Sequence, residues 1–86
     1  MKLIDVLATK VHTAIEIYTL TNKWVLDDIF NCLGIIDIDY KVEVFIKNFI
    51  YDAYMDITYN KDDKESRILE CSNSILKWLV RSGYIR

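Results

Sequence analysis

The chain contains no proline, only two glycines and only one histidine in 86 residues. The scarcity of proline and glycine disfavours a turn-rich sheet protein and favours helices. One histidine and two cysteines without a CxxC pair exclude the usual spacings of a zinc site. The sequence also lacks a glycine-rich phosphate loop and any GxSxG or SxxK setting for a nucleophilic serine. We therefore expect no enzyme, no cofactor and no metal.

Charge and hydropathy exclude two further classes of protein. No apolar run reaches the roughly 18 residues of a membrane span, and no signal-peptide pattern opens the chain. We therefore expect a cytoplasmic protein that does not contact a membrane. Eleven basic and thirteen acidic residues give a net charge of −2, without the basic stripe typical of nucleic-acid-binding proteins. This balance disfavours nucleic acid as a partner.

The residues that are present suffice for one hydrophobic core. Hydrophobic residues make up 52% of the chain, which is typical of a globular protein, and 86 residues leave no room for a second core. We therefore expect a single globular domain over residues 1–86. Cys32 and Cys71 are expected as free, buried thiols, because nothing in the sequence points to secretion.

Short polar stretches divide the chain into four segments of helical length. Residues 2–20 repeat apolar side chains at helical spacing, which predicts an amphipathic helix. Thr21 can act as the N-cap of a second helix, with its first turn at residues 22–24 and its end at Gly34. A fourth segment follows Asp62, which forms a capping-box pattern with Glu65, and ends at Gly83.

The third segment, residues 36–59, fits two structures. Apolar and polar residues alternate strictly over residues 36–44, and alternation resumes over residues 49–59, as in a hairpin with a turn at Lys47 and Asn48. That turn lacks the glycine that tight hairpins prefer, and the register places Glu43 opposite Asp52. The hairpin would give an α+β fold.

As a helix, the third segment collects its apolar residues on one arc and offers Asp39 as the N-cap. We favour this interpretation because it avoids the facing acidic pairs. The expected fold is therefore all-α, with three to four amphipathic helices around one core. The α+β fold with a hairpin at about residues 36–59 is the alternative.

Several large apolar side chains remain after this core is assigned. Trp24 is predicted on the polar side of its helix, outside the core, beside Asp27 and Asp28. In a helical third segment, a second stripe of large side chains runs away from the main apolar arc. Tryptophan, tyrosine and methionine are enriched at interfaces. The predicted partner-binding surface consists of Trp24, Asp27, Asp28, Tyr40, Val44, Tyr51 and Met55.

This surface favours the hypothesis that the protein is a small non-enzymatic protein-binding module that acts as a regulator or inhibitor. Its aromatic and acidic side chains would dock on another protein or, as a homodimer, on a second copy of the chain. Trp78 is expected in the core instead, because it shares an arc with Ile75 and Leu79.

The alternative function is a helix-turn-helix transcription regulator. The hydrophobic spacing of residues 26–35, with Gly34 at the turn, resembles the start of that motif. Asp37, Asp39 and Glu43 would open the recognition helix and repel phosphate, which favours the protein-binding hypothesis. The candidate phosphate contacts are Lys41, Lys47, Lys77 and Arg81.

Overall fold

The computed structural model describes residues 2–35 and 37–85, and within them the chain forms four helices and no strand. These are α1 (Leu3–Thr21), α2 (Asp27–Leu33), α3 (Tyr40–Tyr59) and α4 (Lys64–Arg81). The all-α prediction is confirmed. The alternative hairpin is wrong, because one continuous helix, α3, occupies both of its strands. Ile36, where the alternating pattern begins, lies outside the described residues.

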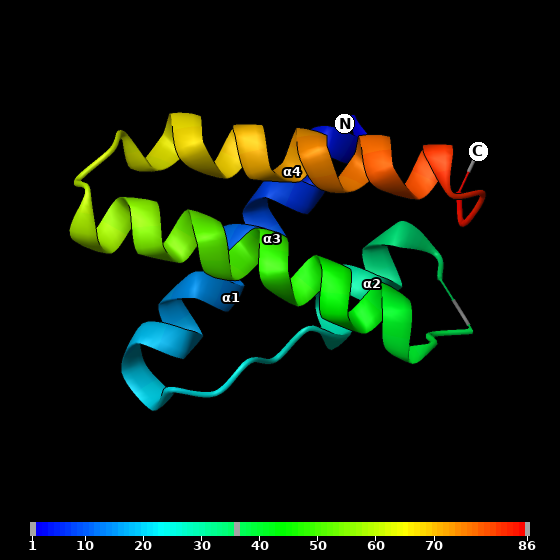
Figure 1. The fold of residues 1–86 in the computed structure, drawn as a ribbon, viewed down its shortest axis with the longest axis horizontal. Coiled ribbons are helices and arrows are strands. Elements are labelled where there is room, and N and C mark those ends of the chain that lie inside the picture. Colours follow the sequence, from blue (N-terminus) through cyan, green and yellow to red (C-terminus); the bar gives the residue numbers. More distant parts are fainter. Residues whose placement is uncertain (1, 36, 86) are drawn as a thin grey trace.

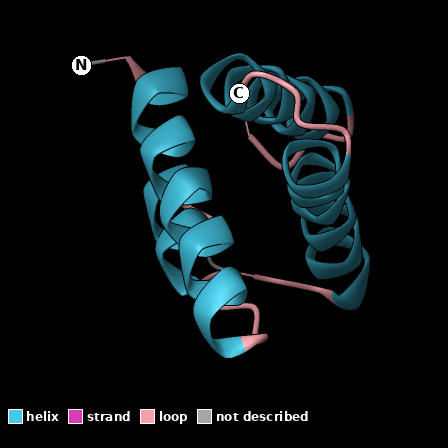
Figure 2. Ribbon diagram, turned by 90° about the vertical axis from the view of Figure 1, so that its left-hand side faces the viewer, coloured by secondary structure: helices cyan, strands magenta, loops and turns pink. Residues whose placement is uncertain are grey.

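Helices α3 and α4 lie side by side and run in opposite directions, while α1 crosses behind them (Figure 1). Figure 2 shows α1, with α2 partly hidden behind it, in one layer beside the α3–α4 pair. The short α2 packs against α1. The core lies between these layers, and Val11, Ile46 and Ile75 contribute fully buried side chains from the three long helices.

Helix α3 begins where the sequence predicts. The Asp39 carboxylate accepts a hydrogen bond of 2.9 Å from the backbone N–H of Val42, so Asp39 is the N-cap. Buried side chains then follow at helical spacing along the face that meets the core. A hairpin would bury alternate residues instead, including the partly or largely exposed Val44 and Tyr40. The apolar spacing of about 3.6 residues per turn, and not the alternation of every second residue, therefore matches the structure of this segment.

Helix α1 extends to Thr21, which changes the start of the next element. Asn22 adopts a left-handed conformation with a φ of 60°, and its N–H donates to the Tyr18 carbonyl at 2.7 Å. This bond is a common way to end a helix, and asparagine tolerates the left-handed region better than most residues. The Thr21 hydroxyl donates back to the Ile17 carbonyl. The prediction that Thr21 caps the second helix is therefore wrong.

Residues 22–26 form a non-helical connection, and α2 begins only at Asp27. Its N-cap, Leu26, provides no side-chain hydrogen bond, while Asp27 and Asp28 stand in the first turn, where carboxylates interact favourably with the helix dipole. The predicted first turn at residues 22–24 is thus wrong as well. Gly34 ends α2 with a φ of 70°, as predicted.

Helix α4 is capped by Asp63, whose carboxylate accepts a 3.2 Å hydrogen bond from the N–H of Glu65. The predicted cap, Asp62, lies one residue too early, because the helix begins at Lys64. At the other end Gly83 has a φ of 82° and Tyr84 folds back on the last turn, as predicted.

Trp78 packs against the core from the side of α4 but is only half-buried. Its ring stacks on Phe45 at a centroid distance of 4.5 Å and on Tyr84 at 5.6 Å. The Tyr84 hydroxyl also donates to the Asp39 carboxylate at 3.0 Å. These contacts join the end of α4 to the start of α3.

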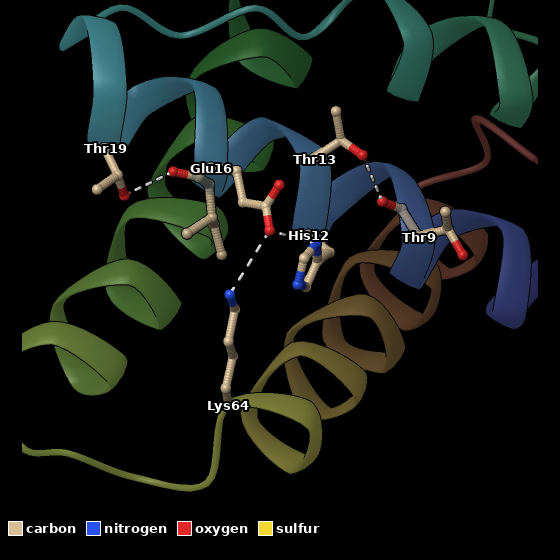
Figure 3. Close-up of polar contacts among 7 residues, drawn as sticks. Thr9, His12, Thr13, Glu16, Thr19 and Lys64 are labelled. Carbon is tan, nitrogen blue, oxygen red and sulfur yellow. Dashed lines mark hydrogen bonds and ion pairs between the residues drawn. The ribbon is translucent and has the colours of Figure 1, made fainter.

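Polar contacts on α1 link it to the start of α4 (Figure 3). Glu16 Oε1 lies 3.4 Å from His12 Nδ1 and 3.8 Å from Lys64 Nζ. All three side chains are about half exposed, so these polar contacts stabilise the fold only weakly. The hydroxyls of Thr9 and Thr13 donate to backbone carbonyls one turn earlier in α1.

Both cysteines are free, as predicted, but only Cys71 is buried, so the prediction that Cys32 is buried is wrong. Cys71 is buried and donates to the Phe49 carbonyl at 3.3 Å, and burial raises the pKa of its thiol to about 12. Cys32 is only half-buried, and partial desolvation raises the pKa of its thiol as well. Among the residues that the structure describes, no helix is both long and apolar enough to cross a membrane.

Candidate protein-binding surface

Trp24 belongs to an aromatic cluster made of Tyr18, Trp24, Tyr51 and Tyr54. Its ring stacks on Tyr18 of α1 at a centroid distance of 4.1 Å and meets the edges of Tyr51 and Tyr54 of α3 at 6.4 Å each. Trp24 is therefore half-buried in the 22–26 connection. The prediction that it projects from the polar side of a helix is wrong, because no helix forms there.

The aromatic cluster holds three parts of the chain together. It joins the end of α1, the 22–26 connection and the middle of α3, although α1 and α3 contact each other only little elsewhere. Edge-to-face and stacked ring pairs each contribute about 0.5–1.5 kcal/mol beyond the burial of their area. Tyr51 nevertheless keeps 41% of its surface exposed. The cluster is thus both a structural contact and part of the outer surface.

A pocket of about 370 Å³ opens beside this cluster, and we call it the Trp24 pocket. Its walls come from the 22–26 connection, the first turn of α2, the connection before α3 and the first half of α3. Five apolar and three charged residues line it, and its exposed surface is about equally polar and apolar. The lining residues are Trp24, Val25, Leu26, Asp27, Phe30, Ile38, Glu43 and Lys47.

The charges of the Trp24 pocket are predominantly negative. Asp27 and Glu43 supply two carboxylates, and Lys47 supplies one ammonium, whose Nζ lies 3.9 Å from Glu43 Oε1. Within the described residues Asp27 forms no ion pair, and Asp28 stands next to it, exposed, in the first turn of α2. A ligand that fills the pocket therefore meets apolar walls and an acidic edge.

The structure brings only some of the predicted surface residues together. Trp24 and Asp27 line the pocket, and Tyr51 lies beside Trp24. Tyr40, Val44, Tyr51 and Met55 share one side of α3, since they are spaced by 4, 7 and 4 residues. Tyr40 is 82% exposed, whereas Val44 and Met55 are half-buried, and all three lie outside the pocket and the aromatic cluster. Asp28 flanks the pocket without lining it.

Sequence reasoning missed several residues of this surface. Tyr18 and Tyr54 are not among the predicted surface residues, yet both pack against Trp24. No pattern over one or two helical turns could reveal this, because the contact depends on the turn at Asn22. Glu43 and Lys47 form a favourable i, i+4 pair on the exposed side of α3, and that spacing is visible in the sequence.

The arrangement of α2 and α3 differs from the motif behind the alternative hypothesis. In a helix-turn-helix, a turn of about 3–4 residues joins two helices that pack on one another. Here residues 34–39 separate the two helices, and α2 packs against α1. Of the candidate phosphate contacts, Lys47 is paired with Glu43, while Lys77 and Arg81 lie on the exposed side of α4.

The chain matches no family model, no curated protein and no solved structure. In the part of the chain that the structure describes, no three His, Cys, Asp or Glu side chains gather as a metal site requires. The functional argument therefore starts from the Trp24 pocket and its charges.

Proposed function

We propose that this protein is a small, non-enzymatic protein-binding module that acts in the cytoplasm as a regulator or inhibitor. The observation that supports this proposal is a pocket with apolar and charged walls beside a partly exposed aromatic cluster, with an excess of carboxylates at its edge. Free cysteines are consistent with the reducing cytoplasm. The expected occupant is a segment of another protein.

The chemistry of the pocket defines the segment that fits. Trp24, Val25 and Ile38 offer apolar contact to a large side chain such as leucine or phenylalanine. Asp27 and Glu43 favour a neighbouring lysine or arginine, because Lys47 neutralises only one of the two carboxylates. A volume of about 370 Å³ is at the lower end of ligand pockets, which hold about 300–1,000 Å³. We therefore expect a short basic and apolar segment.

Selection from a displayed library of random peptides tests this proposal. Peptides that bind the wild-type protein should carry a lysine or arginine beside a large apolar residue. Val25 is 47% exposed in the pocket, so Val25→Glu should keep the fold while it places a charge against the apolar anchor. We expect it to weaken binding of a selected peptide by about 10- to 100-fold, which corresponds to the loss of an interface hot spot.

The matched control is Leu20→Glu, because Leu20 is 85% exposed and lies away from the Trp24 pocket. It should leave peptide binding unchanged. Selection that enriches no basic and apolar peptides would contradict the proposal, as would equal effects of Val25→Glu and Leu20→Glu.

A further inference from the structure

The outer face of α4 carries apolar side chains in a heptad-like order. Leu69, Asn73, Leu76 and Val80 follow one another at spacings of 4, 3 and 4 residues, the spacing of a coiled-coil seam. Leu69 is 44% exposed and Val80 is 52% exposed, although both belong to an 18-residue helix that buries its opposite face in the core. This seam uses none of the residues of the Trp24 pocket.

Glu70 and Lys77 flank the seam on one side of α4. They are seven residues apart, which places them two helical turns apart on the same side, and both are exposed. In the described part of the chain neither forms an ion pair. This flank of the seam therefore carries an acidic side chain in the first half of α4 and a basic side chain in the second half.

The seam is bordered by two hollows. One holds about 400 Å³ between α1 and the first half of α4, and its lining includes Ile68 and Leu69 of α4 and Thr9, His12 and Thr13 of α1. The other holds about 380 Å³ on the second half of α4, around Leu76 and Val80. Each half of the seam thus has a hollow in which a side chain of a partner can lie.

We propose that two copies of this chain form a dimer in which their α4 seams pack antiparallel about a two-fold axis midway between Asn73 and Leu76. In this arrangement Leu69 meets Val80 of the second copy, and Asn73 meets Leu76 of the second copy. Val80 then lies over the hollow between α1 and α4 of the second copy. The two Asn73 side chains lie near the axis, where a buried asparagine fixes the register of such helix pairs.

The charges select a second copy as the occupant. An antiparallel pair sets Glu70 opposite Lys77 of the second copy, and the two-fold axis repeats this attraction. A parallel pair would instead bring Glu70 beside Glu65 of the second copy, where the two carboxylates repel each other. The charges beside the seam therefore favour the antiparallel arrangement. The dimer leaves both Trp24 pockets free, so it can engage two partner segments at once.

Sedimentation of charge-reversal variants tests the dimer. The wild type should sediment as a dimer. Lys77→Glu sets two acidic side chains against each other on this flank of the seam, and Glu70→Lys sets two basic side chains against each other, so each variant alone should dimerise at least about 10-fold more weakly. A mixture of the two variants should form a heterodimer, since every facing pair is then attractive. Circular dichroism checks that both variants remain helical.

Two further variants distinguish this interface from one formed by the side of α3 that carries Tyr40, Val44, Tyr51 and Met55. Val80→Asp should dissociate the dimer, because it places a charge in the seam. Tyr40→Glu changes a side chain that is 82% exposed on α3, and the dimer should persist. A monomeric wild type at millimolar concentration would overturn the proposal. So would a mixture that stays monomeric, or dissociation by Tyr40→Glu in place of Val80→Asp. Peptide binding by the Trp24 pocket is measured separately and does not depend on this result.

Discussion

At the residue scale, Trp24 shows how one side chain can serve both the fold and the surface. The sequence places it outside the core, and its change to alanine would then alter stability by less than about 1 kcal/mol. Three ring contacts with Tyr18, Tyr51 and Tyr54 change that expectation. The residue therefore fixes the 22–26 connection as well as one wall of the pocket.

We predict that Trp24→Ala lowers the free energy of unfolding by about 2 kcal/mol, because it removes ring contacts and leaves a gap between α1 and α3. Trp24→Phe keeps a ring in place and should lose less than half as much. Urea denaturation of both variants measures the difference. A loss below about 0.5 kcal/mol for Trp24→Ala, the range of an ordinary surface substitution, would show that the cluster does not stabilise the fold.

Two carboxylates make stability depend on pH. The Val42 N–H and the Tyr84 hydroxyl lower the pKa of Asp39, and the hydrogen bond from the Arg67 guanidinium, 2.6 Å away, lowers the pKa of Asp56. A carboxylate with a lowered pKa stabilises the fold above its unfolded-state pKa of about 3.9, and this contribution disappears as the pH falls through the folded-state pKa.

Wild-type stability should therefore fall as the pH is lowered from 5 toward 2. Asp56→Asn removes the ionisable group, so this variant should be less stable than the wild type at pH 7. The difference between them should shrink at low pH. Denaturation at several pH values measures this difference, and a gap that stays constant down to pH 2 would contradict the assignment.

At the element scale, local signals predict α3 and α4 better than α2. Asp39 caps α3 as its sequence position indicates, and Gly34 and Gly83 end their helices. The start of α2 is not predictable in this way. Thr21 can stand in the last turn of α1, as it does here, or act as the N-cap of the next helix, and the local sequence does not distinguish the two. Asn22 determines the outcome by adopting the left-handed conformation.

Variants of Asn22 test this explanation. Alanine has no side chain that favours a φ of 60°, so Asn22→Ala should lower the free energy of unfolding by about 1 kcal/mol. Glycine adopts this conformation without strain, so Asn22→Gly should be at least as stable as the wild type. For a chain of this size, 1 kcal/mol corresponds to about 4–8 °C in melting temperature. Equal melting temperatures of the two variants would show that another feature ends α1.

At the scale of the whole molecule, the sequence predicts the fold class but only part of the surface. Helical periodicity identifies the buried faces, because it repeats within each element. The Trp24 pocket joins residues 24–27 to residues 38–47, and the aromatic cluster joins Tyr18 to Tyr54. Contacts over such separations depend on how helices cross, which no local pattern specifies. Tyr40 and Met55, which the sequence groups with Trp24, lie outside the pocket for this reason.

The two proposed interfaces lie on different parts of the molecule and serve different purposes. The Trp24 pocket is built from the 22–26 connection, α2 and the first half of α3, whereas the seam belongs to α4 with α1 beside it. A dimer with two free pockets would bind a protein that carries two basic and apolar segments more tightly than one segment alone.

The most direct test of the proposed function follows the two tryptophan indole N–H signals by nuclear magnetic resonance during titration with a selected basic and apolar peptide. Trp24→Phe assigns the two signals, because Trp24 and Trp78 are the only tryptophans. Trp24 lines the pocket, whereas Trp78 stacks between Phe45 and Tyr84 on the α3–α4 side. We predict that the Trp24 signal shifts in proportion to bound peptide while the Trp78 signal stays in place. A shift of Trp78 alone, or of neither signal, would contradict the assignment of the Trp24 pocket as the binding site.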